Sequence, residues 1–265
     1  MKFLIPCLVW LGAFIQIGHS QSFADHEVSH VALIGWSQPD GRPTFFDCTG
    51  SYLGEKMILT GARCLERNGT RADVVRLGAA MDGTPQDFEV DKFVVHYRYQ
   101  AEYYYHNMAI IYLKEDPATS SKRRFRPTCI YSQKPEMDAP VFVVGRDSRG
   151  LFQKTPLELV GSDKCHEFYN PTKKFKYGAL LVCCMCAKNP NTNQCTTELS
   201  APMQMILEKN GKKVPFLVGQ KTIGKSCGSK TPGIYTRLSS DGHFPWIATI
   251  AGIDFRDHDA CMDRY

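Results

Sequence analysis

The sequence has few of the features that would place it in a membrane, on nucleic acid or in a fibre. Beyond its first 20 residues, no apolar run approaches the length that spans a bilayer, and no repeat or low-complexity tract occurs. Lysine and arginine number 32 against 27 acidic residues, so the formal net charge is only +5, whereas binding to a phosphate backbone needs many clustered cations. The sequence therefore argues against a membrane span and against a nucleic-acid partner.

What is present is the composition of a globular protein with many cysteines. The chain has 265 residues, of which 43% are hydrophobic and 22% charged, enough to bury one or two cores. Eleven cysteines are many for a cytosolic protein of this size, because reducing compartments rarely hold structural disulfides. This count favours an oxidising compartment.

Residues 1–20 have the layout of a secretory signal peptide. A short cationic start precedes an apolar run to about Ile17, and Gly18 and Ser20 stand at −3 and −1 of a cut before Gln21. A membrane anchor is the alternative, but the run is short and no stop-transfer charges follow it. Cleavage would remove one lysine and one cysteine, which leaves a charge of 5 − 1 = +4 and 11 − 1 = 10 cysteines. We therefore expect a secreted, extracellular protein with a disulfide framework.

The mature region, residues 21–265, is predicted to be all-β. Short β-branched and aromatic segments are separated by turn residues at 28–35, 56–60, 74–77, 88–97, 109–113, 140–144, 156–160, 179–183, 214–218 and 233–237. One helix is expected near residues 244–251. This pattern is typical of an antiparallel barrel or sandwich. The polar, basic stretch 120–127, which contains Lys122, Arg123 and Arg124, indicates an exposed linker between two β units.

Four ordered segments resemble the trypsin/chymotrypsin-like serine protease family. CTGSYL at 48–53 with ILTGARC at 58–64 resembles the family's C-G-G-S-L…V-L-T-A-A-H-C, and HNMAIIYL at 106–113 resembles N-D-I-A-L-I-x-L. CTTELSAPM at 195–203 stands where the family has C-x-G-D-S-G-G-P-L, and TPGIYTRL at 231–238 resembles x-P-G-V-Y-T-R-V. The opening SHVALIGW at 29–36 is similar to insect members. The resemblance covers nearly the whole mature chain.

The resemblance implies two six-stranded antiparallel β-barrels followed by a C-terminal helix. The N-terminal barrel would occupy about residues 28–120 and the C-terminal barrel about 127–243, with the helix and a tail at 244–265. No cofactor is implied by this family.

The departures from the family pattern concern its catalytic residues. Arg63 stands at the histidine position, Asn107 at the aspartate position and Leu199 at the serine position. Arginine stays protonated and cannot act as a general base, and leucine has no nucleophilic atom. Thr197 replaces the oxyanion-hole glycine, whose backbone freedom a β-branched residue lacks. The sequence thus predicts a catalytically inactive homologue, a pseudoprotease rather than an enzyme.

Activation by an N-terminal amine is not expected either. Active family members pair a freed I-V-G-G amine with the aspartate before the serine, whereas the mature chain would begin QSFA. The partner position is Glu198, a longer carboxylate; whether it finds another cation is left open, with Arg63 as one candidate. Another active site could be built from Ser200 and one of the remaining histidines, which are His30, His96, His106, His166, His243 and His258. Scattered surface or internally satisfied histidines are the simpler interpretation.

The family's disulfides map onto this chain. The resemblance implies Cys48–Cys64, Cys165–Cys186 and Cys195–Cys227. In insect relatives the cysteine at the Cys129 position often bonds a prodomain; because no prodomain is expected here, we propose Cys129–Cys261, which would tether the tail after the helix. Cys183 and Cys184 remain open: a bond between neighbours strains the backbone, so a link to another chain is the alternative. A metal site at these dense thiols is disfavoured in an oxidising compartment, and no metal is expected.

Other candidate sites lie on loops. Asn68 begins an acceptable N-glycosylation sequon in a predicted turn. By resemblance, Gly224 and Gly233 line the former specificity pocket, and Asn193 near its floor replaces the acid that selects basic substrates. The linker cations and a second basic group could contact acidic surfaces, and the second group consists of Lys173, Lys174 and Lys176. Solvated loops are the simpler interpretation of both groups.

These features predict a protein that works by binding. The main hypothesis is a secreted, non-catalytic serine protease homologue that regulates an extracellular proteolytic or innate immune cascade through its proteins or through microbial surfaces. The alternatives are a secreted ligand of host proteins or polyanions, such as a salivary modulator, and a residual serine endopeptidase.

Overall fold

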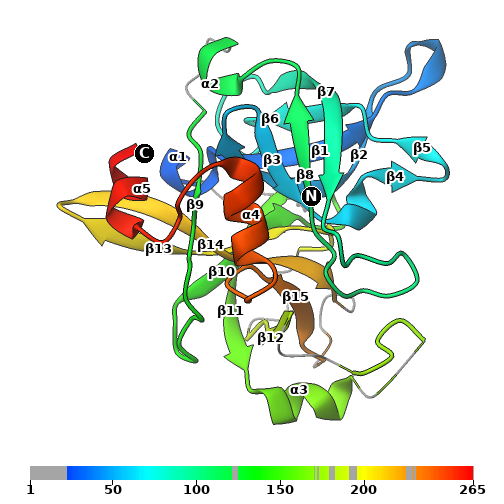
Figure 1. Cartoon of the computed structure of the whole chain (residues 1–265). Helices are drawn as coiled ribbons and strands as arrows, with labels where there is room; N and C mark the ends of the chain where they lie inside the picture. The colour runs from blue at the N-terminus through cyan, green and yellow to red at the C-terminus, as the bar shows by residue number, and fades with distance from the viewer. Residues whose placement is uncertain are drawn as a thin grey trace, which may run out of the picture.

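The protein is described by a computed structural model that covers residues 23–120, 125–169, 171, 173–178, 183–190, 196–224, 229 and 231–264. Two barrels pack side by side, the first in blue to green and the second in green to orange (Figure 1). The prediction of two six-stranded antiparallel barrels is confirmed. The signal-peptide segment lies outside the described residues.

The N-terminal barrel is a closed antiparallel ring. Its strands follow the order β1 (Val31–Trp36), β2 (Phe45–Gly54), β3 (Met57–Thr60), β8 (Ala109–Leu113), β7 (Gln86–Val95) and β6 (Val74–Leu77). A separate hairpin, β4 (Glu66–Arg67) and β5 (Thr70–Arg71), projects from it. Asn68 and Gly69 join this hairpin with φ values of 50° and 79°, as a tight two-residue turn requires.

The C-terminal barrel is closed by the pairing of its first and last strands in the sheet order. The order is β13 (Pro202–Lys209), β10 (Val141–Arg146), β11 (Phe152–Val160), β12 (Cys184–Lys188), β15 (Gly233–Arg237) and β14 (Lys212–Ile223), and β13 also pairs with β14. Strand β9 (Cys129–Ile130) joins β14 in parallel, an addition to the expected antiparallel ring.

Strands β2 and β13 were missing from the sequence prediction, and residues 179–182 of the expected strand at 179–183 lie outside the described residues. Strand β12 begins at Cys184 and pairs with β11 and β15. Phe125 corrects the idea of an exposed linker at 120–127: it is 2% exposed and packs edge-on against Phe88. Lys122, Arg123 and Arg124 lie outside the described residues.

Short helices complete the fold: α1 (Asp25–Val28), α2 (Pro117–Ser120), α3 (Ser162–Phe168), α4 (Phe244–Ala251) and α5 (His258–Arg264), with 3-10 turns at Pro39–Gly41 and Ala62–Cys64. Helix α4 has the predicted bounds, whereas α5 was not anticipated. Residues of α4, α5 and both barrels share one apolar core, so the C-terminal segment helps to hold the barrels together.

Three of the four expected disulfides are present. Cys48–Cys64 joins β2 to the 3-10 turn after β3, Cys165–Cys186 joins α3 to β12, and Cys129–Cys261 joins β9 to α5. Cys195 and Cys227 lie outside the described residues. Cys183 and Cys184 are not joined to each other or to another described cysteine; they are 1% and 3% exposed, and their Sγ atoms lie 3.1 Å apart. Their burial disfavours a bond to another chain.

Candidate functional site

The three positions predicted to correspond to a catalytic triad lie in segments that the fold brings together. The Arg63 backbone N–H donates to Asn107 Oδ1 at 2.9 Å, which joins the turn after β3 to the segment before β8. The Thr49 N–H donates to the Leu199 carbonyl at 3.0 Å, which attaches the 196–201 segment to β2. These contacts place the three segments at the junction of the two barrels.

Arg63 presents its side chain to an aromatic ring. Its guanidinium carbon lies 4.2 Å from the centre of the Tyr104 ring, a cation–π distance. Asn107 is 1% exposed, and its carbonyl accepts a bond from the Gln220 amide at 2.9 Å. Asn107 therefore holds backbone in place, and Arg63 supplies a half-buried positive charge beside Tyr104.

Leu199 and Ser200 offer no hydroxyl to an open cleft. The Leu199 side chain packs against the core of the N-terminal barrel. Ser200 is 1% exposed, and its Oγ accepts the Gly61 N–H at 2.9 Å. A Cβ on Gly61 would stand 2.3 Å from this oxygen, so the close approach requires glycine. The Ser200 hydroxyl is thus used to join the two barrels internally.

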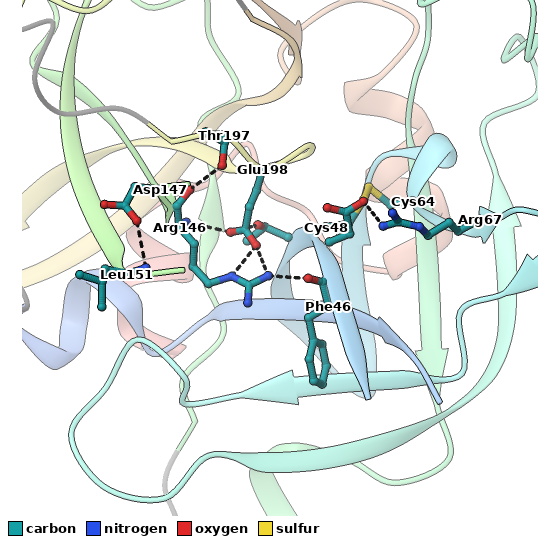
Figure 2. Close-up of polar contacts among 11 residues, drawn as sticks. Phe46, Cys48, Cys64, Arg67, Arg146, Asp147, Leu151, Thr197 and Glu198 are labelled. Carbon is teal, nitrogen blue, oxygen red and sulfur yellow. Dashed lines mark hydrogen bonds and ion pairs between the residues drawn. A yellow bond between two sulfur atoms is a disulfide. The ribbon is translucent and has the colours of Figure 1, made fainter. Parts of the chain in front are cut away.

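Glu198 is paired with an arginine at the end of β10. Its Oε1 accepts from Arg146 Nε at 2.6 Å, and its Oε2 accepts from the Arg146 backbone N–H at 2.8 Å and Thr49 Oγ1 at 2.9 Å. Figure 2 shows the guanidinium reaching both this carboxylate and the Phe46 carbonyl, the latter at 2.8 Å. The candidate pairing of Arg63 with Glu198 is wrong, because Arg146 satisfies both carboxylate oxygens.

Thr197, at the predicted oxyanion-hole position, directs its backbone donor inward. Its N–H donates to the Arg146 carbonyl at 3.0 Å, and its hydroxyl approaches the same carbonyl at 3.3 Å (Figure 2). A backbone N–H engaged in this way is not aimed at a cleft where an oxyanion could form.

A lysine occupies space beside the glycines predicted to line a pocket. Lys221 is 7% exposed and donates from Nζ to the Thr196 carbonyl. A Cβ on Gly224 would lie 2.8 Å from Lys221 Cε and 4.0 Å from Gly233 Cα, so the lysine stem runs along this wall. Burial lowers the pKa of Lys221 to about 8, against the opposing effect of Glu198. Asn193 lies outside the described residues.

A groove of about 800 Å³ lies next to Arg63 on the N-terminal barrel. The β4–β5 hairpin supplies one wall of this groove through Glu66 and Arg71. Charged side chains of both signs and aromatic rings line the groove, among them Arg63, Glu66, Arg71, Asp91, Lys92 and Tyr99. Asn68, at the exposed tip of that hairpin, is in a position where a glycan would point into solvent.

The basic group at 173–176 lies near Tyr104. Lys173, Lys174 and Lys176 are exposed, and Lys174 Nζ stands 5.6 Å from the centre of the Tyr104 ring. The structure therefore brings Lys174 and Arg63 to the same aromatic side chain, although 111 positions separate them in the sequence. No feature of the sequence indicated this pairing.

The histidines are less scattered than expected. His96, His106 and His243 form one group, with His106 Nδ1 2.9 Å from His243 Nε2. His30 is isolated from them, fully buried and bonded through Nε2 to Gln204 Oε1 at 2.7 Å. His258 meets Ser132 Oγ at 3.0 Å. The sequence positions 96, 106 and 243 give no indication of a cluster. The three side chains meet because the fold brings the loop before β8 next to the start of α4.

No helix in the described part of the chain is long and apolar enough to cross a membrane.

Comparison with known proteins finds relatives that align with most of this chain. The chain is 29% identical over 247 residues to the serine protease snk of Drosophila melanogaster and 27% identical over 234 residues to the clotting factor G beta subunit of Tachypleus tridentatus. These alignments cover 86% and 79% of this chain, and 54% and 72% of the relatives. The chain thus spans about half the length of snk, and 35% of the serine protease Hayan of D. melanogaster.

Solved structures support the fold. Kallikrein-related peptidase 10 superposes with a TM-score of 0.64 at 17% identity, covering 87% of this chain and 98% of that one. The family model described as Trypsin matches residues 19–247, which is most of the sequence. The chain therefore belongs to the trypsin family.

Proposed function

We propose that this protein is a secreted trypsin-family member without protease activity, which acts by binding a component of an extracellular proteolytic cascade. The observation that carries the proposal is the side chain of Leu199, which stands at the nucleophile position and packs against the N-terminal barrel. Without a nucleophile there, the acyl-enzyme chemistry of this family has no first step.

The surrounding groups support the same conclusion. An arginine side chain cannot serve as a general base, and the guanidinium of Arg63 faces Tyr104. The Thr197 N–H donates to the Arg146 carbonyl, which leaves this donor unavailable to an oxyanion. Loss of a single triad member costs roughly four to six powers of ten in rate in proteases of this type. Three replaced positions therefore leave no measurable hydrolysis by this route.

A binding role is supported by what remains at the junction of the barrels. Arg63 and Lys174 approach one aromatic ring, and the groove beside Arg63 has charges of both signs. Loops held on a rigid β scaffold are suited to recognition. Relatives described as a serine protease and as a clotting factor subunit make a cascade protease, or its protein substrate, the partner class to test first.

The experiment has a chemical part and a binding part. The purified mature chain is incubated with a fluorophosphonate probe and with peptide substrates beside an active trypsin-family control. We expect no labelling and no turnover. The chain is then added to a cascade protease acting on its protein substrate, where we expect a changed cleavage rate and no change with a small peptide substrate. Covalent labelling of this chain would overturn the proposal.

A second function is favoured by one observation, the approach of Arg63 and Lys174 to Tyr104. Two cations against an aromatic ring form a patch that suits sulfated or carboxylated polymers. Retention on heparin at physiological ionic strength, reduced by Lys174→Ala, would support this alternative. Elution from heparin below physiological ionic strength would exclude this alternative, because it would show that the attraction is a diffuse one that salt screens.

A further inference from the structure

Three histidines from distant parts of the sequence meet between the barrels. His96 follows β7, His106 precedes β8, and His243 is the N-cap residue of α4. One ring nitrogen of each lies within 4.8 Å of the others. His96 and His243 are buried and His106 is half-buried, so the group has one side toward solvent.

The hydrogen bonds fix which nitrogen of His243 carries a lone pair. His243 Nδ1 lies 2.6 Å from the Arg237 carbonyl, which can only accept, so Nδ1 carries the proton. Nε2 of the neutral ring is then the acceptor for His106 Nδ1, 2.9 Å away. His96 Nε2 lies 3.1 Å from the Gly242 carbonyl, so Nδ1 is the nitrogen available to an ion, and binding would replace the 3.3 Å bond that it accepts from the Arg98 backbone N–H. A backbone carbonyl behind a ring nitrogen is the usual support of a metal-binding histidine.

We propose that His96, His106 and His243 form a zinc site with an open fourth position. Three imidazoles and one open position match the ligand preference of Zn²⁺. Zn–N distances of about 2.0–2.1 Å place the nitrogens of a tetrahedral site about 3.3 Å apart. The observed separations, 2.9 Å for one pair and at most 4.8 Å within the group, lie on either side of that distance. Small rotations of the three rings suffice to bind the ion.

Zinc would replace the proton that His106 shares with His243. Coordination through His106 Nδ1 moves that ring's proton to Nε2 or to solvent, while His243 keeps its Nδ1 proton on the Arg237 carbonyl. The ring pairs are already close, with the His96 and His106 centres 5.3 Å apart and those of His96 and His243 5.1 Å apart. The left-handed φ of 51° at His106 helps to point its ring at this group.

Two arginines lower the expected affinity. Burial is the main cause that lowers the pKa of His96, His106 and His243, and the nearby charges of Arg98 and Arg237 lower it further. The cluster itself holds no carboxylate. We therefore expect binding weaker than in structural zinc sites, and we expect Arg98→Gln to strengthen it by roughly threefold to tenfold through loss of repulsion.

Bound zinc would tie the β7–β8 loop to helix α4. This loop carries Tyr104, which contacts Arg63, and His106 directly precedes Asn107. A metal at this position would therefore restrain the residues at the junction of the barrels, whichever partner they bind. The proposal stands apart from the proposed function, because zinc binding is measured without a partner.

The test uses the untagged mature chain, stripped with EDTA, dialysed and titrated with zinc chloride by calorimetry. We expect one ion per chain. His106→Asn, which tolerates a left-handed φ, and His243→Gln should each weaken binding by roughly 100-fold. His258→Gln is the matched control, because this histidine is also half-buried but lies outside the group. Cobalt(II) should give a tetrahedral visible spectrum in the wild type and not in His106→Asn.

Two results would overturn the proposal. One is the absence of saturable binding at about 100 µM zinc, a concentration at which even a weak specific site fills. The other is binding that persists in His106→Asn and His243→Gln, which would place the metal elsewhere. Binding that is lost in a Cys183→Ser, Cys184→Ser variant and retained in the histidine variants would assign it to the thiol pair instead.

Discussion

The two sides of Leu199 use arginine in opposite ways. Toward the C-terminal barrel, Arg146 pairs with Glu198, whose side chain is 6% exposed, and also donates to the Phe46 carbonyl. Toward the N-terminal barrel, Arg63 lies over Tyr104 at the edge of a groove. One arginine is committed to the interior, whereas the other leaves its charge near the surface. Substitutions on the first side should therefore affect folding, and those on the second should affect recognition.

The largest effect is expected from Arg146→Met. This change leaves the Glu198 carboxylate buried without its cation, which costs about 3–5 kcal/mol of unfolding free energy. The Phe46 carbonyl loses a donor as well. Urea denaturation with intact disulfides measures the loss as a lower midpoint at an unchanged m-value.

A double variant distinguishes the destabilisation caused by an unpaired Glu198 carboxylate from the stabilisation contributed by the Arg146–Glu198 ion pair. Arg146→Met combined with Glu198→Met removes both charges, and we expect it to recover most of the loss. Arg256→Met, at an ion pair with Asp254 on the surface, is the control and should leave the midpoint unchanged. An equally unstable double variant would show that packing around Arg146, rather than its charge, stabilises this region.

The next largest effect is a dependence of the unfolding free energy on pH, caused by the buried side chain of His30. Burial lowers the pKa of His30 from its ordinary 6.5 to about 4, although its bond to Gln204 opposes the shift. Between these values the unfolded chain takes up a proton that the folded protein does not. The contribution of His30 is therefore complete above pH 6.5, falls as the pH drops, and levels off below about 4, a change of roughly 3 kcal/mol.

His30→Gln removes this titration and can keep a bond to Gln204. The difference in unfolding free energy between wild type and variant should shrink in favour of the variant as the pH falls from 7 to 4.5. His96, His106 and His243, whose pKa values are also lowered by burial, titrate in both proteins and cancel in the difference. Parallel stability curves across this range would contradict the assignment to His30.

The sequence predicted the architecture better than the connections at its centre. Strands β6, β8 and β15 have the predicted bounds because alternating β-branched residues and turn signals mark them. Strand β13 was missed because its sequence, PMQMILEK, consists largely of residues that favour helices, and pairing with β10 and β14 overrides that preference.

Partners in the site were harder to predict because they are distant in sequence. Glu198 meets a cation 52 positions earlier, and nothing around Arg146 distinguishes it from other arginines. The zinc-site histidines likewise come from a loop and a helix start that are adjacent only in the fold. Motif resemblance located the segments, but only the folded register determined which side chains meet.

The third prediction tests the surface side of the comparison. Arg63→Ala removes an interaction with Tyr104 that is worth about 0.5–1 kcal/mol at a partly exposed site, so the unfolding free energy should change by no more than that. Affinity for a cascade partner should fall by about tenfold or more, because the lost charge lies at the groove. Surface plasmon resonance and denaturation on the same preparation compare the two effects.

Arg67→Ala is the matched control for this prediction. Arg67 also lies over an aromatic ring, 4.2 Å from the centre of Phe45, and pairs with exposed Asp47, but it does not line the groove. We expect little change in partner affinity from this variant. Similar losses for both arginines would mean that general positive charge, rather than the position of Arg63, controls binding.

The smallest effect is expected at the tip of the β4–β5 hairpin, beyond the groove wall. Asn68 is exposed there at a φ of 50°, and its sequon should carry a glycan in a secreted preparation. Thr70→Ala removes the sequon without changing the turn residue, and should lower the mass by one glycan while altering stability by less than about 0.5 kcal/mol.

Asn68→Gln should lose the same mass but destabilise the hairpin slightly more, because glutamine tolerates the left-handed turn less well than asparagine. Equal masses for wild type and Thr70→Ala would show that the sequon is unused. A loss of partner affinity in Thr70→Ala would instead extend the binding surface from Arg63 to this hairpin.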